Sequence, residues 1–346
     1  MRRLPILATA LLVSASGVRA DVPNIVVDIP PVFSLVSSVM QGVGTPKLLL
    51  RGNESPHNFA LRPSQRRDLG QADIIFWIGE GLTPWLEKAQ ASLTQTPISV
   101  ALGKQTGVVQ LSFREGAFFE AHDEHDEHDE HDEHDGHDEV NGHTEHNHAE
   151  THENAAAHDG KDHQDHAGHD HSGLDPHFWL DPENAIHWIY TIADILSQKD
   201  PENAGTYYAN ATRTKASLEL LNKNIAQQMA PHRAERFLIV HDAFQYFEAR
   251  FGLAAQGAIS DGHAAPPSAA RILAIRKLMQ NQKISCVFAE PGYNAKLLDN
   301  LISETSVRLK QLDPLGAGLP LDHTLYEAVL QNMADMMVAC FTNDEG

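Results

Sequence analysis

Short apolar runs alternate along the chain with segments in which apolar residues recur at helical spacing. The runs that predict β-strands are Ile25–Ile29, Lys47–Leu50, Asp73–Ile78, Ile98–Val100, Phe237–Val240, Ile284–Phe288 and Val307–Leu312. Near-continuous apolar strands separated by helices are typical of parallel sheets that are covered on both faces. The pattern therefore predicts an α/β protein with two such sheets, one in each half of the chain.

A long helical segment separates the two halves. Asp200 and Pro201 form an N-cap and first-turn pattern, and Pro231 ends the segment. The apolar positions inside it recur at helical spacing, at Leu218, Leu221, Ile225 and Met229. A helix from Pro201 to Met229 would be roughly 44 Å long at 1.5 Å per residue. That length suits a stiff connector between two lobes, but an ordinary core helix would show the same periodicity.

The first 20 residues have the pattern of a targeting segment. A basic start at Arg2 and Arg3 precedes an apolar stretch, Leu4–Val13, that is too short to span a bilayer. The small residue Ala20 then precedes Asp21, the expected first residue of the mature chain. We expect a signal peptide that directs export to the periplasm; an uncleaved membrane anchor is the alternative.

The chain has a formal charge of −21, and most of it comes from one stretch. The 50 residues from His122 to His171 contain 18 Asp and Glu, one Lys and 15 of the 22 histidines. This stretch carries −17, which leaves −4 for the remainder of the chain. No Lys/Arg-rich segment indicates nucleic-acid binding, so DNA and RNA are excluded as partners.

The acidic stretch opens with histidine at every third position. These histidines are His122, His125, His128, His131, His134 and His137. Because almost no aliphatic residue is present, the stretch cannot bury enough surface to offset its ordering entropy, and we expect a disordered surface loop. Imidazole and carboxylate groups both bind Zn²⁺, Ni²⁺ and Cu²⁺, which predicts weak metal loading at several sites. A solvated acidic linker is the alternative.

Seven histidines lie outside this stretch, and three of them occupy positions typical of a binding site. His241 follows a buried strand, where open α/β sheets bind ligands. His57 follows the Lys47–Leu50 strand after a turn, and His177 lies just before a helix that Asp181 is expected to cap. No role is assigned to the other four.

Three neutral imidazoles suit tetrahedral Zn²⁺, whereas Mn²⁺ and Mg²⁺ prefer oxygen-rich sites. Water, Asp313 and Glu54 are the candidates for the fourth position. Asp313 is preferred because it follows the Val307–Leu312 strand and a strand end is more rigid than the turn that carries Glu54.

Five sequence blocks, in the same order, resemble the periplasmic zinc-binding components of ABC zinc-uptake transporters, the ZnuA-like branch of the cluster A-I metal-binding proteins. The blocks are SPHNFALRPS (55–64), DPHFWLDPENA (175–185), HDAFQYFEARFGL (241–253), CVFAEPGYN (286–294) and LDPLG (312–316). The resemblance extends from the signal peptide to Cys340 and includes a His/Asp-rich insertion between the first two blocks.

The resemblance implies metal ligands at His57, His177 and His241. It also implies a disulfide between Cys286 and Cys340, the only cysteines; their even number alone fits either one bridge or two buried thiols. Family members often carry an acidic residue directly before the first ligand histidine, and here Pro56 stands at that position. This difference argues against a carboxylate ligand from that turn.

The family fold implies two (β/α)4 lobes with parallel sheets, joined by one long helix, with the metal site in the cleft between the lobes. The expected boundaries are a signal peptide at 1–20, an N-terminal lobe at 21–200 with the loop at 122–171, a linking helix at 201–230, and a C-terminal lobe at 231–346. The implied function is capture of Zn²⁺ and its delivery to an inner-membrane ABC permease. We expect a monomer, and a periplasmic zinc chaperone is a further candidate partner.

Two other classes of function are compatible with three histidines. A secreted zinc hydrolase would leave one metal position open for water, but the sequence contains no His-Glu-x-x-His motif and no Gly-x-Ser-x-Gly motif. A metal-storage or surface metal-adhesion protein would act through the His-rich loop alone. The two predicted sheets argue against this third class, and the protein is not expected to be an enzyme.

Overall fold

The computed structural model describes residues 22–51, 54–114, 116, 118–119, 173–260, 266–293, 295–303 and 305–343. The predicted signal peptide and the six histidines expected in the acidic loop lie outside these residues. Within the described ranges, no helix combines the length and the apolar character needed to cross a membrane.

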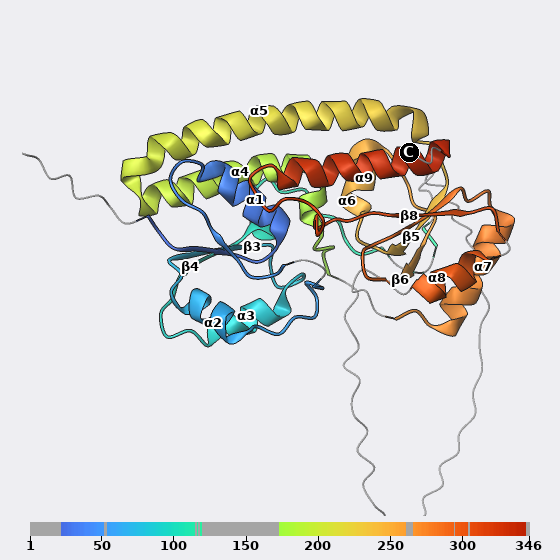
Figure 1. Ribbon diagram of the computed structural model, residues 1–346, viewed down its shortest axis with the longest axis horizontal. Helices are drawn as coiled ribbons and strands as arrows, with labels where there is room; N and C mark the ends of the chain where they lie inside the picture. The colour runs from blue at the N-terminus through green and yellow to red at the C-terminus, as the bar shows by residue number, and fades with distance from the viewer. Residues whose placement is uncertain are drawn as a thin grey trace, which may run out of the picture. The chain divides into compact units, whose positions relative to one another are not determined.

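The N-terminal half forms a four-stranded parallel sheet with the strand order β2-β1-β3-β4. Strands β3 and β4 of this sheet are labelled in Figure 1. Its strands are β1 (Ile25–Val27), β2 (Lys47–Leu48), β3 (Ile74–Trp77) and β4 (Ile98–Ala101). Its helices are α1 (Pro30–Val39), α2 (Pro63–Gly70), α3 (Pro84–Ala91) and α4 (Pro182–Lys199). Each of these helices has proline in its first turn, where the missing N–H costs no intrahelical hydrogen bond.

The C-terminal half repeats this arrangement with the strand order β6-β5-β7-β8. Its strands are β5 (Phe237–His241), β6 (Ala258–Ser260), β7 (Cys286–Ala289) and β8 (Arg308–Gln311). Its helices are α6 (Gln245–Phe251), α7 (Ala269–Asn281), α8 (Ala295–Ile302) and α9 (Leu325–Thr342). The α/β fold with two parallel sheets is therefore confirmed.

The central strands are buried on both faces, which explains their continuous apolar sequences. In β1, Ile25 and Val27 pack into a core shared with α1 and α4, whereas Val26 faces a separate cluster under α2 and α3. In β5, Ile239 joins the core with α5 and α9, and Val240 faces a cluster under α7 and α8. Because successive side chains point to opposite faces, one apolar run serves two layers of helices.

The long helix α5 (Ala204–Met229) connects the two halves of the fold. A short 3-10 turn at Pro201–Asn203 precedes it, so the α-helix begins three residues later than the sequence predicts. It packs against α1, α4 and α9 and ends shortly before β5 (Figure 1).

Side chains from each half bind the backbone of the other half directly. The Trp179 Nε1 donates to the Pro314 carbonyl at 2.8 Å, and the Tyr326 hydroxyl donates to the Trp179 carbonyl at 2.7 Å. Both tyrosine and tryptophan are fully buried, so these bonds lie away from water. They hold the two sheets together close to the loops that carry the candidate ligands.

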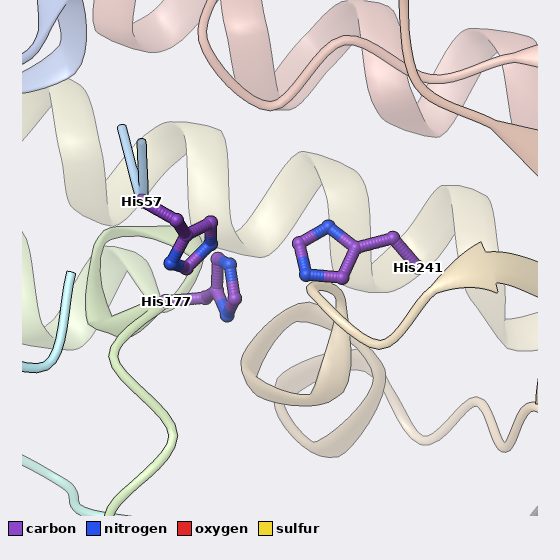
Figure 2. Close-up of side chains that lie close together, drawn as sticks. All are labelled: His57, His177 and His241. Atoms are coloured by element: carbon purple, nitrogen blue, oxygen red, sulfur yellow. The ribbon is translucent and has the colours of Figure 1, made fainter. Parts of the chain in front are cut away.

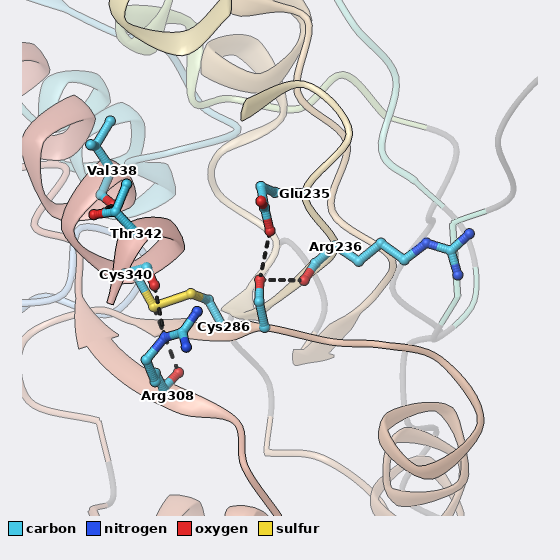
Figure 3. The surroundings of a disulfide bond; sticks show 8 residues. Glu235, Arg236, Cys286, Arg308, Val338, Cys340 and Thr342 are labelled. Carbon is cyan, nitrogen blue, oxygen red and sulfur yellow. Dashed lines mark hydrogen bonds between the residues drawn. A yellow bond between two sulfur atoms is a disulfide. The ribbon is translucent and has the colours of Figure 1, made fainter. Parts of the chain in front are cut away.

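A disulfide joins Cys286, the first residue of β7, to Cys340 in α9 (Figure 3). Nearby, the Arg308 Nε donates a hydrogen bond to the Cys340 carbonyl at 2.7 Å. Both contacts tie the last helix to the C-terminal sheet, at the end of the strands opposite His241.

Candidate metal centre

Three histidines from three separate parts of the chain meet at one point (Figure 2). His57 lies in the loop between β2 and α2, His177 precedes a 3-10 turn (Phe178–Leu180) that leads to α4, and His241 is the last residue of β5. Their imidazole centroids are 5.1–5.6 Å apart, and one potential ligand atom from each lies within 4.8 Å of the others.

The local sequence explains how each imidazole is placed. His241 continues a fully buried strand, and α6 after it ends at Gly252 in the left-handed conformation, with φ of 72°. His177 is fixed from behind by the start of α4, where the Asp181 carboxylate caps the helix by accepting from the Glu183 N–H at 2.9 Å. His177 and His241 are almost completely buried, whereas His57 is half-buried.

The three imidazoles line a pocket of about 380 Å³ that also includes Glu290, Tyr293 and Asp313. A tetrahedral Zn²⁺ with bonds of about 2.0–2.1 Å places its nitrogen ligands about 3.4 Å apart. If each imidazole moves inward by roughly one ångström, the ligand nitrogens come as close together as tetrahedral Zn²⁺ requires. The donor set and the pocket thus fit one small, nitrogen-preferring divalent cation.

Two of the imidazoles are in hydrogen-bond contact with a carboxylate through Nδ1. The Asp175 Oδ1 lies 2.7 Å from the His177 Nδ1, and the Glu290 Oε1 lies 2.7 Å from the His241 Nδ1. The sequence alone assigns no role to either carboxylate. Glu290 directly follows β7, so it lies at the end of a strand as His241 does, and this position could have been recognised in the sequence.

The carboxyl groups next to the proposed ligands have shifted pKa values. Burial raises the pKa of Asp175 to about 7, although the His177 backbone N–H and the charge of Arg114 act in the opposite direction. Burial also raises the pKa of Asp242 to about 6 despite its ion pair with Arg114. Glu290 differs: its burial acts to raise its pKa, but the adjacent His241 outweighs that effect and lowers it below the ordinary value.

The structure does not bring Asp313 or Glu54 into the group of ligand atoms found among the described residues. The Asp313 carboxylate accepts backbone N–H groups from Leu315, Gly316 and Ala317 at 2.6–3.0 Å. The Glu54 carboxylate accepts the Arg51 N–H at 3.0 Å and pairs with Arg62. Both carboxylates therefore already have partners within their own loops, although both border the pocket.

Two parallel sheets joined by a long helix, with three imidazoles that could hold a metal ion in one pocket, are the features of a solute-binding protein for a metal ion. The chain matches the family model described as the periplasmic component A of a zinc-uptake complex, ZnuA, over residues 25–340. The chain belongs to this family.

Relatives match over nearly the whole chain. The high-affinity zinc uptake system protein ZnuA of Brucella suis is 39% identical over 338 residues, covering 97% of both chains. Its counterpart from Paracoccus denitrificans is 40% identical over 340 residues, covering 98% of both chains.

Solved structures share the fold. A crystal structure of ZnuA has a TM-score of 0.66 at 24% identity and covers 91% of this chain and 99% of its own. The solute-binding protein FpvC of Pseudomonas aeruginosa, in complex with Mn²⁺, has a TM-score of 0.69 at 18% identity and covers 93% of this chain and 99% of its own. At these identities the likeness concerns the fold alone.

Proposed function

We propose that this protein captures Zn²⁺ in the periplasm and delivers it to an inner-membrane ABC permease. The main support is the convergence of three imidazoles in one pocket, with ligand atoms within 4.8 Å of one another. Three nitrogen donors favour Zn²⁺ over Mn²⁺ or Mg²⁺, which prefer oxygen-rich sites. The names of the curated relatives, which describe zinc uptake, support the same ion.

In this proposal His57, His177 and His241 bind the ion and water completes the tetrahedron. Neither Asp313 nor Glu54 joins the cluster of ligand atoms among the described residues, which favours water over either carboxylate. This replaces our sequence-based preference for Asp313.

The bound ion is cargo rather than a catalytic centre, because the family is a component of an uptake complex.

We also propose that residues 1–20 are a signal peptide, that 21–200 and 231–346 form the two lobes, and that 201–230 links them. The histidines from His122 to His137 serve as weak metal sites in the inserted loop. The protein works as a monomer that meets the permease, and a periplasmic zinc chaperone is a second candidate partner.

Single substitutions His57→Ala, His177→Ala and His241→Ala test the ligand set. Each leaves an incomplete coordination shell, so Zn²⁺ affinity measured by competition with a strong chelator should fall at least tenfold. His187→Ala is the matched control, because His187 is exposed on α4 and lies outside the cluster. If a variant keeps the Zn²⁺ affinity of the parent protein, the histidine that was replaced is not a ligand.

Hydrolase assays on the zinc-loaded protein should show no turnover.

A further inference from the structure

Two of the three imidazoles are hydrogen-bonded through the same ring nitrogen to a carboxylate of their own lobe. The His177 Nδ1 faces Asp175 and the His241 Nδ1 faces Glu290, each at 2.7 Å. The second contact follows from the sheet register. Ile239 of β5 pairs with Phe288 of β7, and two residues further along the two parallel strands come His241 and Glu290.

A neutral imidazole has one N–H group and one nitrogen lone pair. A carboxylate at Nδ1 favours the form in which Nδ1 carries the proton, so that the lone pair is on Nε2. From this geometry we propose that Asp175 and Glu290 are positioning residues that set both imidazoles in the metal-binding form. This inference rests on the proposed function, since it concerns the same site.

The Glu290 carboxylate also supplies charge that the ligands lack. Three neutral imidazoles add no negative charge to a divalent cation, and a cation in a largely buried pocket is costly unless anions lie nearby. Two other buried carboxylates near the site, Asp242 and Glu248, are both paired with Arg114. Of the two positioning residues, Glu290 is thus the anion that acts on the ion through its ligand, His241.

The two positioning residues differ in how firmly the fold holds them. Asp175 is 1% exposed, and its Oδ1 also accepts the His177 backbone N–H at 3.0 Å. The Glu290 side chain is 27% exposed and borders the pocket. A change at Asp175 disturbs the local fold as well as the imidazole, whereas a change at Glu290 isolates the effect on His241.

The experiment compares Glu290→Gln with Glu290→Leu. Glutamine keeps an oxygen that accepts from the imidazole N–H but removes the charge, and leucine removes both. Loss of such an outer carboxylate costs about 10- to 100-fold in metal affinity. We expect a Zn²⁺ affinity about tenfold weaker for Glu290→Gln, and a larger loss for Glu290→Leu, by chelator competition.

The ring nitrogen of His241 that carries the proton can be measured directly, and a general loss of stability would not change it. Long-range ¹H–¹⁵N spectra of the metal-free protein should show His241 with its proton on Nδ1 in the parent and in Glu290→Gln. In Glu290→Leu the two forms should become mixed. Glu235→Gln is the matched control, because Glu235 accepts from the Ser285 hydroxyl at the opposite end of β5 from His241 (Figure 3).

Parent-like Zn²⁺ affinity in both Glu290 variants, or a loss no greater than that of Glu235→Gln, would overturn the inference. So would an unchanged His241 form in Glu290→Leu. Failure of this inference is distinguishable from failure of the proposed function. If His241→Ala keeps tight binding, the ligand set is wrong; if His241→Ala loses it and the Glu290 variants do not, only the positioning role is wrong.

Discussion

The Trp85 indole N–H donates a hydrogen bond to the carbonyl oxygen of Pro56, at 2.7 Å. Pro56 immediately precedes His57, and the Phe59 ring packs on the same indole, with ring centroids 5.0 Å apart. Trp85 belongs to α3, so one side chain of the N-terminal lobe holds the loop on both sides of the first proposed ligand.

Replacement of Trp85 by phenylalanine should therefore weaken zinc binding without removing a ligand. The lost hydrogen bond has a net value of about 0.5–1.5 kcal/mol, which corresponds to roughly a two- to tenfold loss of Zn²⁺ affinity. Chelator competition measures this change. Trp188→Phe is the control, because Trp188 also donates to a backbone carbonyl, that of Leu102, but from α4. An equal loss of affinity in both variants would contradict a specific role for Trp85.

Removal of the disulfide should lower stability and leave the metal site intact. Cys286 and Cys340 are 54 residues apart in sequence, and a loop of this length gives about 4 kcal/mol in the chain-entropy model. The double variant Cys286→Ser/Cys340→Ser should unfold at a lower denaturant concentration than the parent. Its Zn²⁺ affinity should remain within about twofold, since the bridge lies at the opposite end of β5 and β7 from His241. Unchanged stability would contradict this prediction.

A buried carboxylate in the N-terminal lobe predicts a pH dependence of stability. Asp28 is fully buried after β1, where it accepts the backbone N–H groups of Ile29 and Ile78 at 2.8 Å. Burial raises its pKa from 3.8 to about 7, so the folded protein holds this proton more tightly than the unfolded chain does. The stabilisation is complete below the unfolded pKa and is lost as the pH rises towards 7.

For the metal-free protein, the free energy of unfolding of the parent relative to Asp28→Asn should fall between pH 4 and 7. The slope should approach about 1.4 kcal/mol per pH unit within this range. Urea unfolding of both proteins at several pH values, with a chelator present, measures the difference. Parallel pH profiles for the parent and the variant would show that Asp28 does not titrate in this way.

The sequence predicted seven of the eight described strands. The central strands β1, β3, β5 and β7 were predicted because burial on both faces needs continuous apolar residues. The edge strands β2, β4 and β8 are partly exposed and were predicted from shorter apolar or β-branched runs. The prediction missed β6, whose three residues, Ala258–Ser260, include only one β-branched side chain. The three histidines that the structure brings together could be selected because strand ends and helix starts are visible in a sequence. The partners of Asp313 could not be predicted, since they depend on the exact turn of the backbone from Leu315 to Ala317.

Deletion of Asp123 to Asp170 should remove the weak metal sites and keep one tight site. The chain on either side of the insertion is already paired: the Asp175 N–H donates to the Leu111 carbonyl at 2.8 Å, and Ser112 forms an antiparallel bridge with Leu174. The remaining residues can therefore close the gap without disturbing His177. Titration calorimetry should show fewer weak equivalents and one tight Zn²⁺. Disappearance of the tight equivalent would place the main site in the loop.

We propose that one Zn²⁺ is bound by His57, His177 and His241. The most direct test is a crystal structure of the zinc-loaded protein with an anomalous difference map recorded at the zinc absorption edge. We predict one dominant peak about 2.0–2.1 Å from a nitrogen of each of the three imidazoles, with water in the fourth position. A dominant peak at any other location, or one that contacts fewer than these three histidines, would contradict the claim.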